Sequence, residues 1–298
     1  MPAALPDHIR TALAPLEAAL SAVASQSRSG RAFALAYSGG MDSRFLAHAA
    51  GLLGFEPQLF MAVGPHVPPE EEKFGEAWTC ANGFPFRKLE VDTLSLPLVA
   101  VNDKRRCYEC KRAIFSRLME YLTSEGGARL ALCDGTNSSD ALSYRPGTQA
   151  VKELGVLSPL AMAGLNKADI YRLAALTGME RPDQKPRPCL LTRLPYGVKP
   201  DASTLRALAA GEQAVRLALE AAGMPEADFR LRLVLRGEVL RSELHLLQGD
   251  TEALPPAVAE QLPHAIAEAA PSLPSLVFLV PQVSLSGFFD KAQPSGNA

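Results

Sequence analysis

The feature that most limits the fold is a short apolar segment that runs into two glycines and then into a helical pattern. Leu35 to Tyr37 reads as the end of a buried strand, and the string Ser38-Gly39-Gly40-Met41-Asp42-Ser43 follows it directly. Glycines let the backbone turn tightly and bring its N–H groups close to an anion, and a helix N-terminus adds partial positive charge there. The Gly-Lys-Ser/Thr ending of a Walker A loop is absent. The string predicts a phosphate-binding turn at the carboxyl end of a strand, in which Ser38 and Ser43 donate to phosphate oxygens; the simpler alternative is a plain strand–turn–helix connection with a serine cap.

Apolar runs of strand length alternate with segments of helical periodicity through the first 180 residues. Strands are expected at 33–37, 59–63, 129–133 and, on a weaker pattern, 87–91, and helices at 44–53, 70–82, 108–122 and 167–177. An amphipathic helix carrying Leu13, Leu16, Leu20 and Val23 is expected to precede them, with Pro15 in its first turn. Alternating strands and helices predict an α/β fold with a parallel, doubly wound sheet.

The stretch from 180 to 200 changes character because prolines follow one another closely, at Pro182, Pro186, Pro188, Pro195 and Pro200. Such a run cannot continue a helix or a central strand. Beyond it we expect a helix at 202–222, a hairpin of strands 229–235 and 240–247, a further helical stretch and an apolar run at 276–280. The predicted organisation is an α/β domain over 1–180, a proline-rich loop or linker over 181–200, a small α+β domain over 201–290 and a disordered tail over 291–298.

Charge and cysteine content exclude several classes of protein. The chain has 30 basic and 32 acidic residues, so it lacks the basic excess that is typical of a nucleic-acid-binding domain. Its five cysteines are sparse and odd in number, which argues against a disulfide framework. The N-terminus makes a poor signal peptide, and no stretch approaches the length of a membrane span. These features predict a soluble, cytoplasmic protein with no membrane partner and no nucleic acid partner.

Several motifs, in order along the chain, resemble those of a known family. The string from Ser38 to Ser43 resembles the SGGxDS loop of the PP-loop ATP pyrophosphatases, which cleave ATP to AMP and pyrophosphate. Later stretches are Arg106-Cys107-Tyr108-Glu109-Cys110-Lys111, Asp134-Gly135-Thr136-Asn137, Arg145-Pro146-Gly147, Ser158-Pro159-Leu160 and, over 185–197, Lys-Pro-Arg-Pro-Cys-Leu-Leu-Thr-Arg-Leu-Pro-Tyr-Gly. Over most of residues 30–200 these motifs resemble the LarE family of sacrificial sulfur insertases.

The resemblance implies a PP-loop sheet that binds ATP and Mg²⁺, and a small anionic nucleotide as substrate. Family members adenylate a carboxylate of a pyridinium mononucleotide, and their own cysteine attacks the acyl adenylate. The sulfur stays with the product while the cysteine becomes dehydroalanine, and the products feed the nickel-pincer cofactor of lactate racemase. Family members assemble as homo-oligomers, so we expect a homo-oligomer here.

The same resemblance implies roles for individual residues. The residues expected to bind ATP and pyrophosphate are Ser38, Gly39, Gly40, Asp42, Ser43 and Asp134. Cys189 matches the donor cysteine, and the basic side chains of Lys185, Arg187 and Arg193 near it in sequence would favour its thiolate. The alternative for Cys189 is a small buried hydrophobe, which is the commoner environment of a lone cysteine.

Other motif residues have open roles. Cys107 and Cys110 form a CxxC, which can be a redox pair, a half-site for an iron–sulfur cluster together with Cys189, or part of helix packing; a structural zinc site would need a second pair of ligands. Arg106 and Lys111 are expected to bind substrate or phosphate, unless their basic run is only a solvated face. Asp134 can orient Mg²⁺ or the ribose, and Asp140 is a further candidate metal ligand.

The chain departs from the family pattern at two places. Ser139 precedes Asp140 where the family has two adjacent acids, and Ser284-Leu285-Ser286-Gly287-Phe288-Phe289 stands where the family has Asp-Leu-x-Gly-Tyr-Arg. Arg230 and Arg232 share one strand face, and a two-residue turn at Gly237-Glu238 would place Arg232 opposite Glu243 and Arg230 opposite His245. This group is either a surface ion pair or a phosphate clamp held by Glu243, and in the second case Arg193, Arg230, Arg232 and Glu243 bind the substrate.

Three other functions compete with sulfur transfer to a small nucleotide. Thiolation of tRNA predicts a broad basic surface, which the near-neutral charge disfavours. An amide synthetase that uses ammonia would not require Cys189. A nucleotide-binding protein that has lost catalysis would explain the missing acids near 139 and 284, whereas the intact string at 38–43 speaks against it.

Overall fold

The structure is a computed structural model that describes residues 5–27, 30–124, 130–142, 146–274 and 277–290. The chain divides into two compact units, and each is described by itself. The first unit comprises residues 1–64, 69–93 and 105–187, and the second comprises 65–68, 94–104 and 188–298. The long part of the second unit therefore begins at Pro188, within the proline-rich segment.

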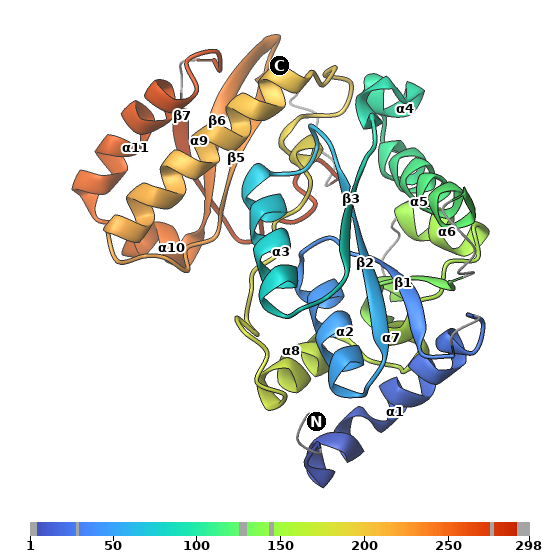
Figure 1. Ribbon diagram of the computed structural model, residues 1–298. Coiled ribbons are helices and arrows are strands. Elements are labelled where there is room, and N and C mark those ends of the chain that lie inside the picture. Colours follow the sequence, from blue (N-terminus) through green and yellow to red (C-terminus); the bar gives the residue numbers. More distant parts are fainter. Residues whose placement is uncertain (1–4, 28–29, 125–129, 143–145, 275–276, 291–298) are drawn as a thin grey trace. The chain divides into compact units, whose positions relative to one another are not determined.

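The first unit is built on a parallel four-stranded sheet with the strand order β3-β2-β1-β4 (Figure 1). Its strands are β1 (Ala32–Ala36), β2 (Glu56–Val63), β3 (Phe86–Glu90) and β4 (Leu132–Asp134). Its helices are α1 (Asp7–Ala24), α2 (Met41–Leu52), α3 (Pro69–Ala81), α5 (Arg106–Ser124), α6 (Pro146–Glu153), α7 (Pro159–Met162) and α8 (Lys167–Leu176), with a 3₁₀ turn η2 at Ser138–Leu142; a second such turn, η1 at Thr93–Ser95, lies where the chain passes between the units. The prediction of an α/β fold with a parallel sheet is confirmed.

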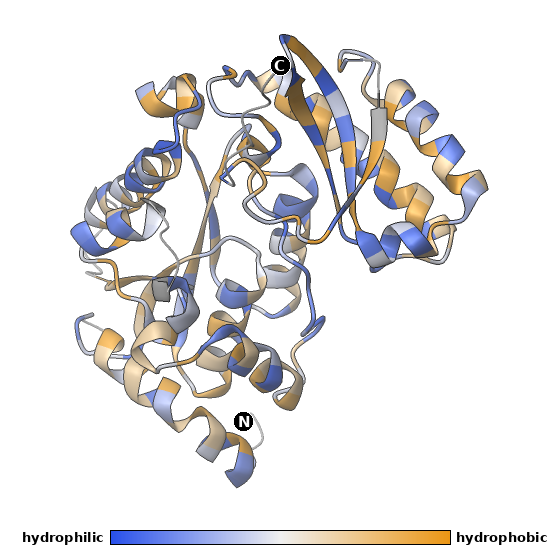
Figure 2. Cartoon of the chain, turned by 180° about the vertical axis from the view of Figure 1, so that it is seen from behind, coloured by the Kyte–Doolittle hydropathy of each residue, from blue (hydrophilic) through white to orange (hydrophobic). Residues whose placement is uncertain are grey.

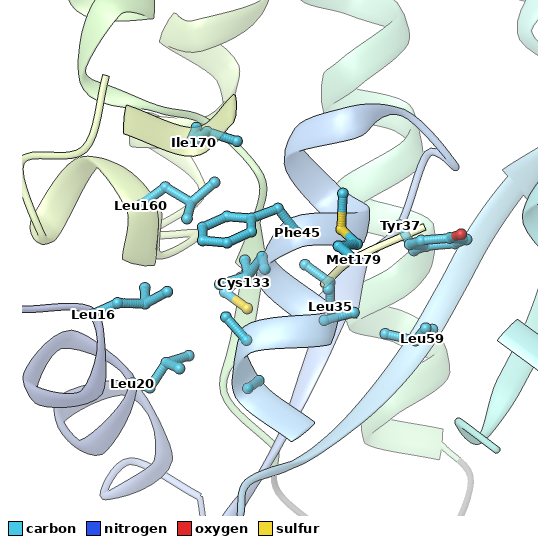
Figure 3. Packing of buried hydrophobic residues seen from close by; sticks show 14 of the residues in the cluster. Leu16, Leu20, Leu35, Tyr37, Phe45, Leu59, Cys133, Leu160, Ile170 and Met179 are labelled. Carbon is cyan, nitrogen blue, oxygen red and sulfur yellow. The ribbon is translucent and has the colours of Figure 1, made fainter. Parts of the chain in front are cut away.

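Side chains of β1 alternate between two apolar layers, because successive residues of a strand point to opposite faces. Phe33 and Leu35 pack with α1, α2, α7 and α8, while Ala34 packs against α5 and α6. Figure 3 shows the first of these layers, in which Phe45 of α2 and Leu160 of α7 belong to the same buried cluster as Cys133 of β4. Burial raises the pKa of the Cys133 thiol, so this cysteine serves packing and not chemistry.

Two expectations about helices and strands need correction. Helix α1 begins at Asp7, so Pro15 lies inside the helix and not in its first turn. Four fully buried side chains, Leu13, Leu16, Leu20 and Val23, carry the helix through the proline, because their burial outweighs one lost hydrogen bond. The strand expected at 129–133 is shorter and ends later, at Asp134, and residue 129 lies outside the described residues.

The second unit contains a three-stranded sheet with the order β5-β6-β7 (Figure 1). Its strands are β5 (Phe229–Arg236), β6 (Val239–Leu247) and β7 (Val277–Gln282), and its helices are α4 (Pro97–Ala100), α9 (Ala202–Ala221), α10 (Gln248–Ala253) and α11 (Pro256–Ala269), with a 3₁₀ turn η3 at Leu190–Arg193. Strands β5 and β6 form the expected hairpin, with Arg236 opposite Val239 across the Gly237-Glu238 turn. The expected tail at 291–298 lies outside the described residues.

Hydrophobic and hydrophilic residues alternate along this hairpin (Figure 2). Leu231 packs against Gly211 of α9, so the leucine positions of β5 face the helices. Arg230 and Arg232 therefore share the opposite face of the sheet. Across the described part of the chain, none of the helices combines the length and the apolar character needed to cross a membrane.

Candidate active site

The turn after β1 has a backbone conformation that requires glycine. Gly39 has a φ of 75°, and a Cβ atom added to it would lie 3.3 Å from the carbonyl oxygen of Glu71 and 3.5 Å from Cε of Met61. Gly40 then serves as the N-cap of α2 in an extended conformation. The motif glycines thus let β1 turn directly into α2, which leaves backbone N–H groups at the start of the helix.

The two motif serines close this turn on itself. The amide of Ser38 donates to the hydroxyl oxygen of Ser43 over 3.2 Å, and the two hydroxyl oxygens lie 3.2 Å apart. The Ser43 hydroxyl also lies 3.1 Å from the carbonyl oxygen of Gly40, to which it donates. Both hydroxyls are therefore held at the N-terminus of α2, where the helix dipole favours an anion.

The end of β4 lies directly beside this turn. Strands β1 and β4 pair so that Ala36 is opposite Asp134, and a Cβ atom on Gly135 would lie only 2.9 Å from the backbone nitrogen of Ser43. In the order β3-β2-β1-β4, strands β2 and β3 follow β1 on one side and β4 lies on its other side, so the direction in which strands are added reverses at β1. Open α/β sheets bind ligands at such a reversal, outside the carboxyl ends of the strands.

Asp134 is buried at this edge and is oriented by several donors. Its carboxylate accepts from the Thr136 amide (3.1 Å), from the Thr136 hydroxyl (2.5 Å) and from the Ser158 hydroxyl (2.7 Å). These contacts join two motifs that are 24 residues apart in the sequence. Asp134 therefore organises the loop after β4, which is a role that does not by itself require a ligand.

Lys167, the first residue of α8, also reaches this edge, and its sequence position had suggested only the start of a helix. Its Nζ lies 2.7 Å from Oδ1 of Asp42, and both side chains are about one-third exposed, at 32% and 27%. A capping box formed by Asn166 and Asp169 fixes the helix start beside the site. A signal was available in the sequence, because a lysine in the first turn of a helix opposes the helix dipole and suggests another use for its charge.

In the second unit, Cys189 directly precedes the turn η3 and is partly buried. The amide and hydroxyl of Thr192 both donate to the carbonyl oxygen of Cys189, over 3.0 and 2.7 Å. The amide of Leu190 donates to the carbonyl oxygen of His66 over 2.9 Å. The backbone around Cys189 is therefore fixed on both sides of its peptide group.

Arg193 holds the same turn through its guanidinium group. It donates to both carboxylate oxygens of Glu212, over 2.7 and 2.9 Å, and its Nη1 donates to the Pro188 carbonyl oxygen and the Thr192 hydroxyl. Arg193 is 2% exposed. Its donors are engaged by protein acceptors, so Arg193 holds the turn, and the substrate binding expected from the sequence stays a prediction.

The hairpin register predicted for the arginine pair is confirmed, with Arg230 opposite His245 and Arg232 opposite Glu243. The group is not a surface ion pair, because all four side chains are buried. Nor does Glu243 bind Arg232 directly; its carboxylate binds Arg236 over 2.6 and 2.8 Å and His245 over 3.0 Å.

Each arginine has its own protein partners. Arg230 donates to Asp228, and Arg232 donates to Nδ1 of His245 over 2.7 Å and to the Leu285 carbonyl oxygen. Burial, with Arg193 and Arg230 nearby, lowers the pKa of Arg232 to about 9. Phosphate binding by Arg230 and Arg232 stays a prediction, whereas the expected support by Glu243 is corrected to an indirect one through His245.

The CxxC residues lie in the first two turns of α5, where Cys107 is exposed and Cys110 is buried. Arg106 is buried, and the Lys111 side chain packs on Gly147, where a Cβ atom would lie 2.8 Å from Cδ of the lysine. Within the described ranges, no group of three or more His, Cys, Asp or Glu side chains is placed to hold a metal ion. The carboxylate of Asp140, the further metal candidate, accepts from the Asn137 amide over 3.2 Å.

Comparisons with known proteins find similarity over part of the chain. No protein-family model matches the chain. The chain is 34% identical over 164 residues, 55% of its length and 60% of the relative's, to an uncharacterized protein of Synechocystis sp.. It is 29% identical over 185 residues, 61% of its length and 66% of the relative's, to pyridinium-3,5-bisthiocarboxylic acid mononucleotide synthase of Lactiplantibacillus plantarum. An uncharacterized protein of Methanocaldococcus jannaschii is 29% identical over 167 residues, 54% of this chain and 60% of that protein, so the chain spans less than two-thirds of each of these relatives.

Proposed function

This chain is a homologue of the LarE synthase of Lactiplantibacillus plantarum, and on that premise we propose that it is an ATP-dependent sulfur transferase. Its substrate in this proposal is a pyridinium mononucleotide carboxylate, and its product serves nickel-pincer cofactor biosynthesis. The observation that carries the proposal is the edge of the first sheet, where the Ser38–Ser43 turn, the N-terminus of α2 and Lys167 surround the reversal between β1 and β4.

The edge has the chemistry that ATP phosphates need. Backbone N–H groups and two hydroxyls face the helix start, and the Lys167 ammonium can exchange its partner Asp42 for a phosphate oxygen because the pair is partly exposed. Because Gly135 lies so close to Ser43, a side chain at position 135 would not fit beside the phosphate turn. ATP therefore belongs here in the proposal, with its phosphates on the turn after β1.

The residues at this edge also suit Mg²⁺. Carboxylate oxygens are the ligands that Mg²⁺ prefers, and it is usually bound by one or two carboxylates together with substrate phosphates. Asp42 in the first turn of α2 and Asp134 at the end of β4 are carboxylates at this edge and would hold it. When bound, the ion would neutralise charge on the phosphate oxygens.

The chemistry then has two parts. A carboxylate oxygen of the substrate attacks the α-phosphorus of ATP and releases pyrophosphate, which converts a poor electrophile into an acyl adenylate. The Cys189 thiolate attacks the acyl carbon and displaces AMP, giving a thioester. Loss of the Cα proton of Cys189 and cleavage of its Cβ–S bond leave the sulfur on the product as a thiocarboxylate and the residue as dehydroalanine.

Intact-protein mass spectrometry tests this proposal. The protein is incubated with MgATP and pyridinium biscarboxylate mononucleotide, and AMP release is measured in the same samples. We expect the protein to lose the mass of H₂S at Cys189, and Cys189→Ala to lose none. Cys80→Ala is the matched control, because Cys80 is also a free cysteine but is exposed at the end of α3, and it should behave as the wild type.

The other outcomes separate the competing functions. Release of AMP and pyrophosphate without mass loss would reject the sacrificial role of Cys189 and keep adenylation. Release that depends on added ammonia would indicate an amide synthetase. No AMP release with any of these substrates would leave thiolation of tRNA or a nucleotide-binding protein that has lost catalysis.

A further inference from the structure

Glu71, in the first turn of α3, contacts both the phosphate turn and the segment that leads to Cys189, although no motif includes it. Its carbonyl oxygen lies 3.3 Å from where a Cβ atom on Gly39 would stand. Its carboxylate accepts from Nη1 of Arg187 over 3.1 Å and from Nε2 of Gln184 over 3.5 Å. We call residues 184–189 the donor segment, because they end at the proposed sulfur donor.

The Glu71 carboxylate depends on this partner because it is buried. The residue is 5% exposed, and burial raises its pKa while the charge and hydrogen bond of Arg187 lower it. Without Arg187, only the Gln184 amide and the charges of Arg181 and Arg44 would offset the solvation that this buried carboxylate has lost. The part of the donor segment that lies in the first unit, residues 184–187, is therefore held on α3 at Arg187.

The sequence of the donor segment passes this restraint on to Cys189. Pro186 and Pro188 have fixed φ angles, and a residue that precedes a proline is restricted to extended conformations. Only Pro188 separates Arg187 from Cys189, and two residues of chain reach at most about 7 Å. Fixing Arg187 therefore limits where the Cys189 thiol can go.

We propose that Glu71 is a positioning residue for sulfur transfer, which holds the donor segment through Arg187 and so presents the Cys189 thiol. The inference rests on the proposed function for its catalytic consequence. The carboxylate contacts Arg187 and Gln184, while the backbone of Glu71 lies against the phosphate turn independently of its side chain.

The test compares Glu71→Gln with Glu70→Gln in the full-length protein. Glu70 is the neighbouring residue of the same helical turn, but it pairs with Lys73 in solvent, where the side chains are 40% and 74% exposed. Two quantities are measured: the rate at which iodoacetamide alkylates Cys189 in the absence of substrates, followed by peptide mass spectrometry, and the rate of mass loss at Cys189 relative to AMP release.

For Glu71→Gln we expect alkylation of Cys189 to be at least about threefold faster, because local opening exposes a partly buried thiol. Sulfur transfer should be about tenfold slower with AMP release unchanged, because a misplaced nucleophile affects only its own step. Glu70→Gln should match the wild type in both. Arg187→Lys keeps a cation and should retain most of the wild-type behaviour. Arg187→Met should resemble Glu71→Gln.

Equal alkylation rates in Glu71→Gln and Glu70→Gln would overturn the inference, and this result does not depend on whether the wild type releases AMP. A purely structural effect of Glu71→Gln would lower AMP release and sulfur transfer together, which would also overturn it. If Glu71→Gln does not fold, the pair Arg187→Met and Arg187→Lys answers the same question, since the Arg187 side chain is 33% exposed.

Discussion

Two ion pairs of this protein, one in each unit, use charged side chains in opposite ways. In the first unit, Asp42 and Lys167 form an ion pair at the carboxyl edge of the sheet, and both side chains remain about one-third exposed, at 27% and 32%. In the second unit, Arg193 is 2% exposed and has four hydrogen bonds to protein acceptors. Partly exposed charges can change partner when a ligand arrives, whereas fully engaged buried charges hold a scaffold.

The polar layer of the second unit is a connected chain of hydrogen bonds. Arg232 donates to Nδ1 of His245, and because an arginine can only donate, His245 carries its proton on Nε2 and donates it to Glu243. Glu243 also accepts from Arg236, and Arg232 donates to the Leu285 carbonyl oxygen. This network of hydrogen bonds joins the hairpin to the segment after β7. Without it, an apolar layer would be needed between them.

The largest expected effect comes from breaking the buried pair of the second unit. Glu212→Ala leaves the Arg193 guanidinium buried without its carboxylate and also removes the acceptor of the Leu231 amide. We expect the free energy of unfolding to fall by about 3–5 kcal/mol, the usual cost of removing one partner of a buried ion pair.

Urea unfolding followed by circular dichroism measures this loss. Glu17→Ala is the matched control, because Glu17 pairs with Arg10 on α1 with side chains that are 34% and 55% exposed, and it should change stability by less than about 1 kcal/mol. Equal losses in the two variants would show that burial does not separate the two kinds of ion pair.

For the Asp42–Lys167 ion pair of the first unit, we expect a smaller change in the free energy of unfolding, together with a loss of function. Lys167→Met should lower kcat/KM for ATP by about 100-fold, because a fixed cation on transferring phosphates contributes mainly to the transition state. Stability should change by less than about 1 kcal/mol, since the pair is partly exposed.

AMP release at varied ATP concentration measures the functional effect. Lys73→Met is the control, because Lys73 pairs with Glu70 on the surface of α3 and should leave AMP release unchanged. A large stability loss with unaltered ATP turnover in Lys167→Met would reverse the distinction between the two ion pairs.

The same contrast explains which features the sequence could predict. The glycine string, the alternation of strands and helices, and the Arg232–Glu243 register all follow from local periodicity and turn chemistry. The partners of buried charges do not follow, because an arginine has several donors and takes whichever acceptors the packed chain brings near. Register placed Arg232 opposite Glu243, yet the hydrogen bonds of Arg232 go to His245 and Leu285.

Long-range placement was missed for the same reason. Lys167 is 125 residues from Asp42, and Glu71 is 116 residues from Arg187. In each case the pairing depends on how helices pack around the sheet, which no local pattern encodes. Pro15 shows the converse, since its local preference for a first turn was overridden by four buried side chains of α1.

The smallest expected effect is a loss of stability in mild acid. Two buried histidines of the second unit contribute to it, and so does His48 of the first unit, whose pKa is also lowered by burial. Burial lowers the pKa of His66 to about 4, and burial together with the Arg232 charge lowers that of His245 to about 4. The unfolded chain therefore binds more protons than the folded one between pH 4 and the ordinary histidine pKa near 6.5. The stability that these neutral imidazoles contribute is complete above that upper limit and is lost as the pH falls toward 4.

Between pH 7 and 5.5 this linkage should cost about 1 kcal/mol for each histidine. Urea midpoints at the two pH values measure the total, and amide hydrogen exchange along β5 and β6 locates it. In His245→Asn, which removes the imidazole while its amide oxygen can still accept from Arg232, the part of the loss that His245 contributes should disappear. An unchanged pH dependence of stability in that variant would mean that His245 is not a neutral member of the buried hydrogen-bond network. The stability of the second unit would then not depend on it.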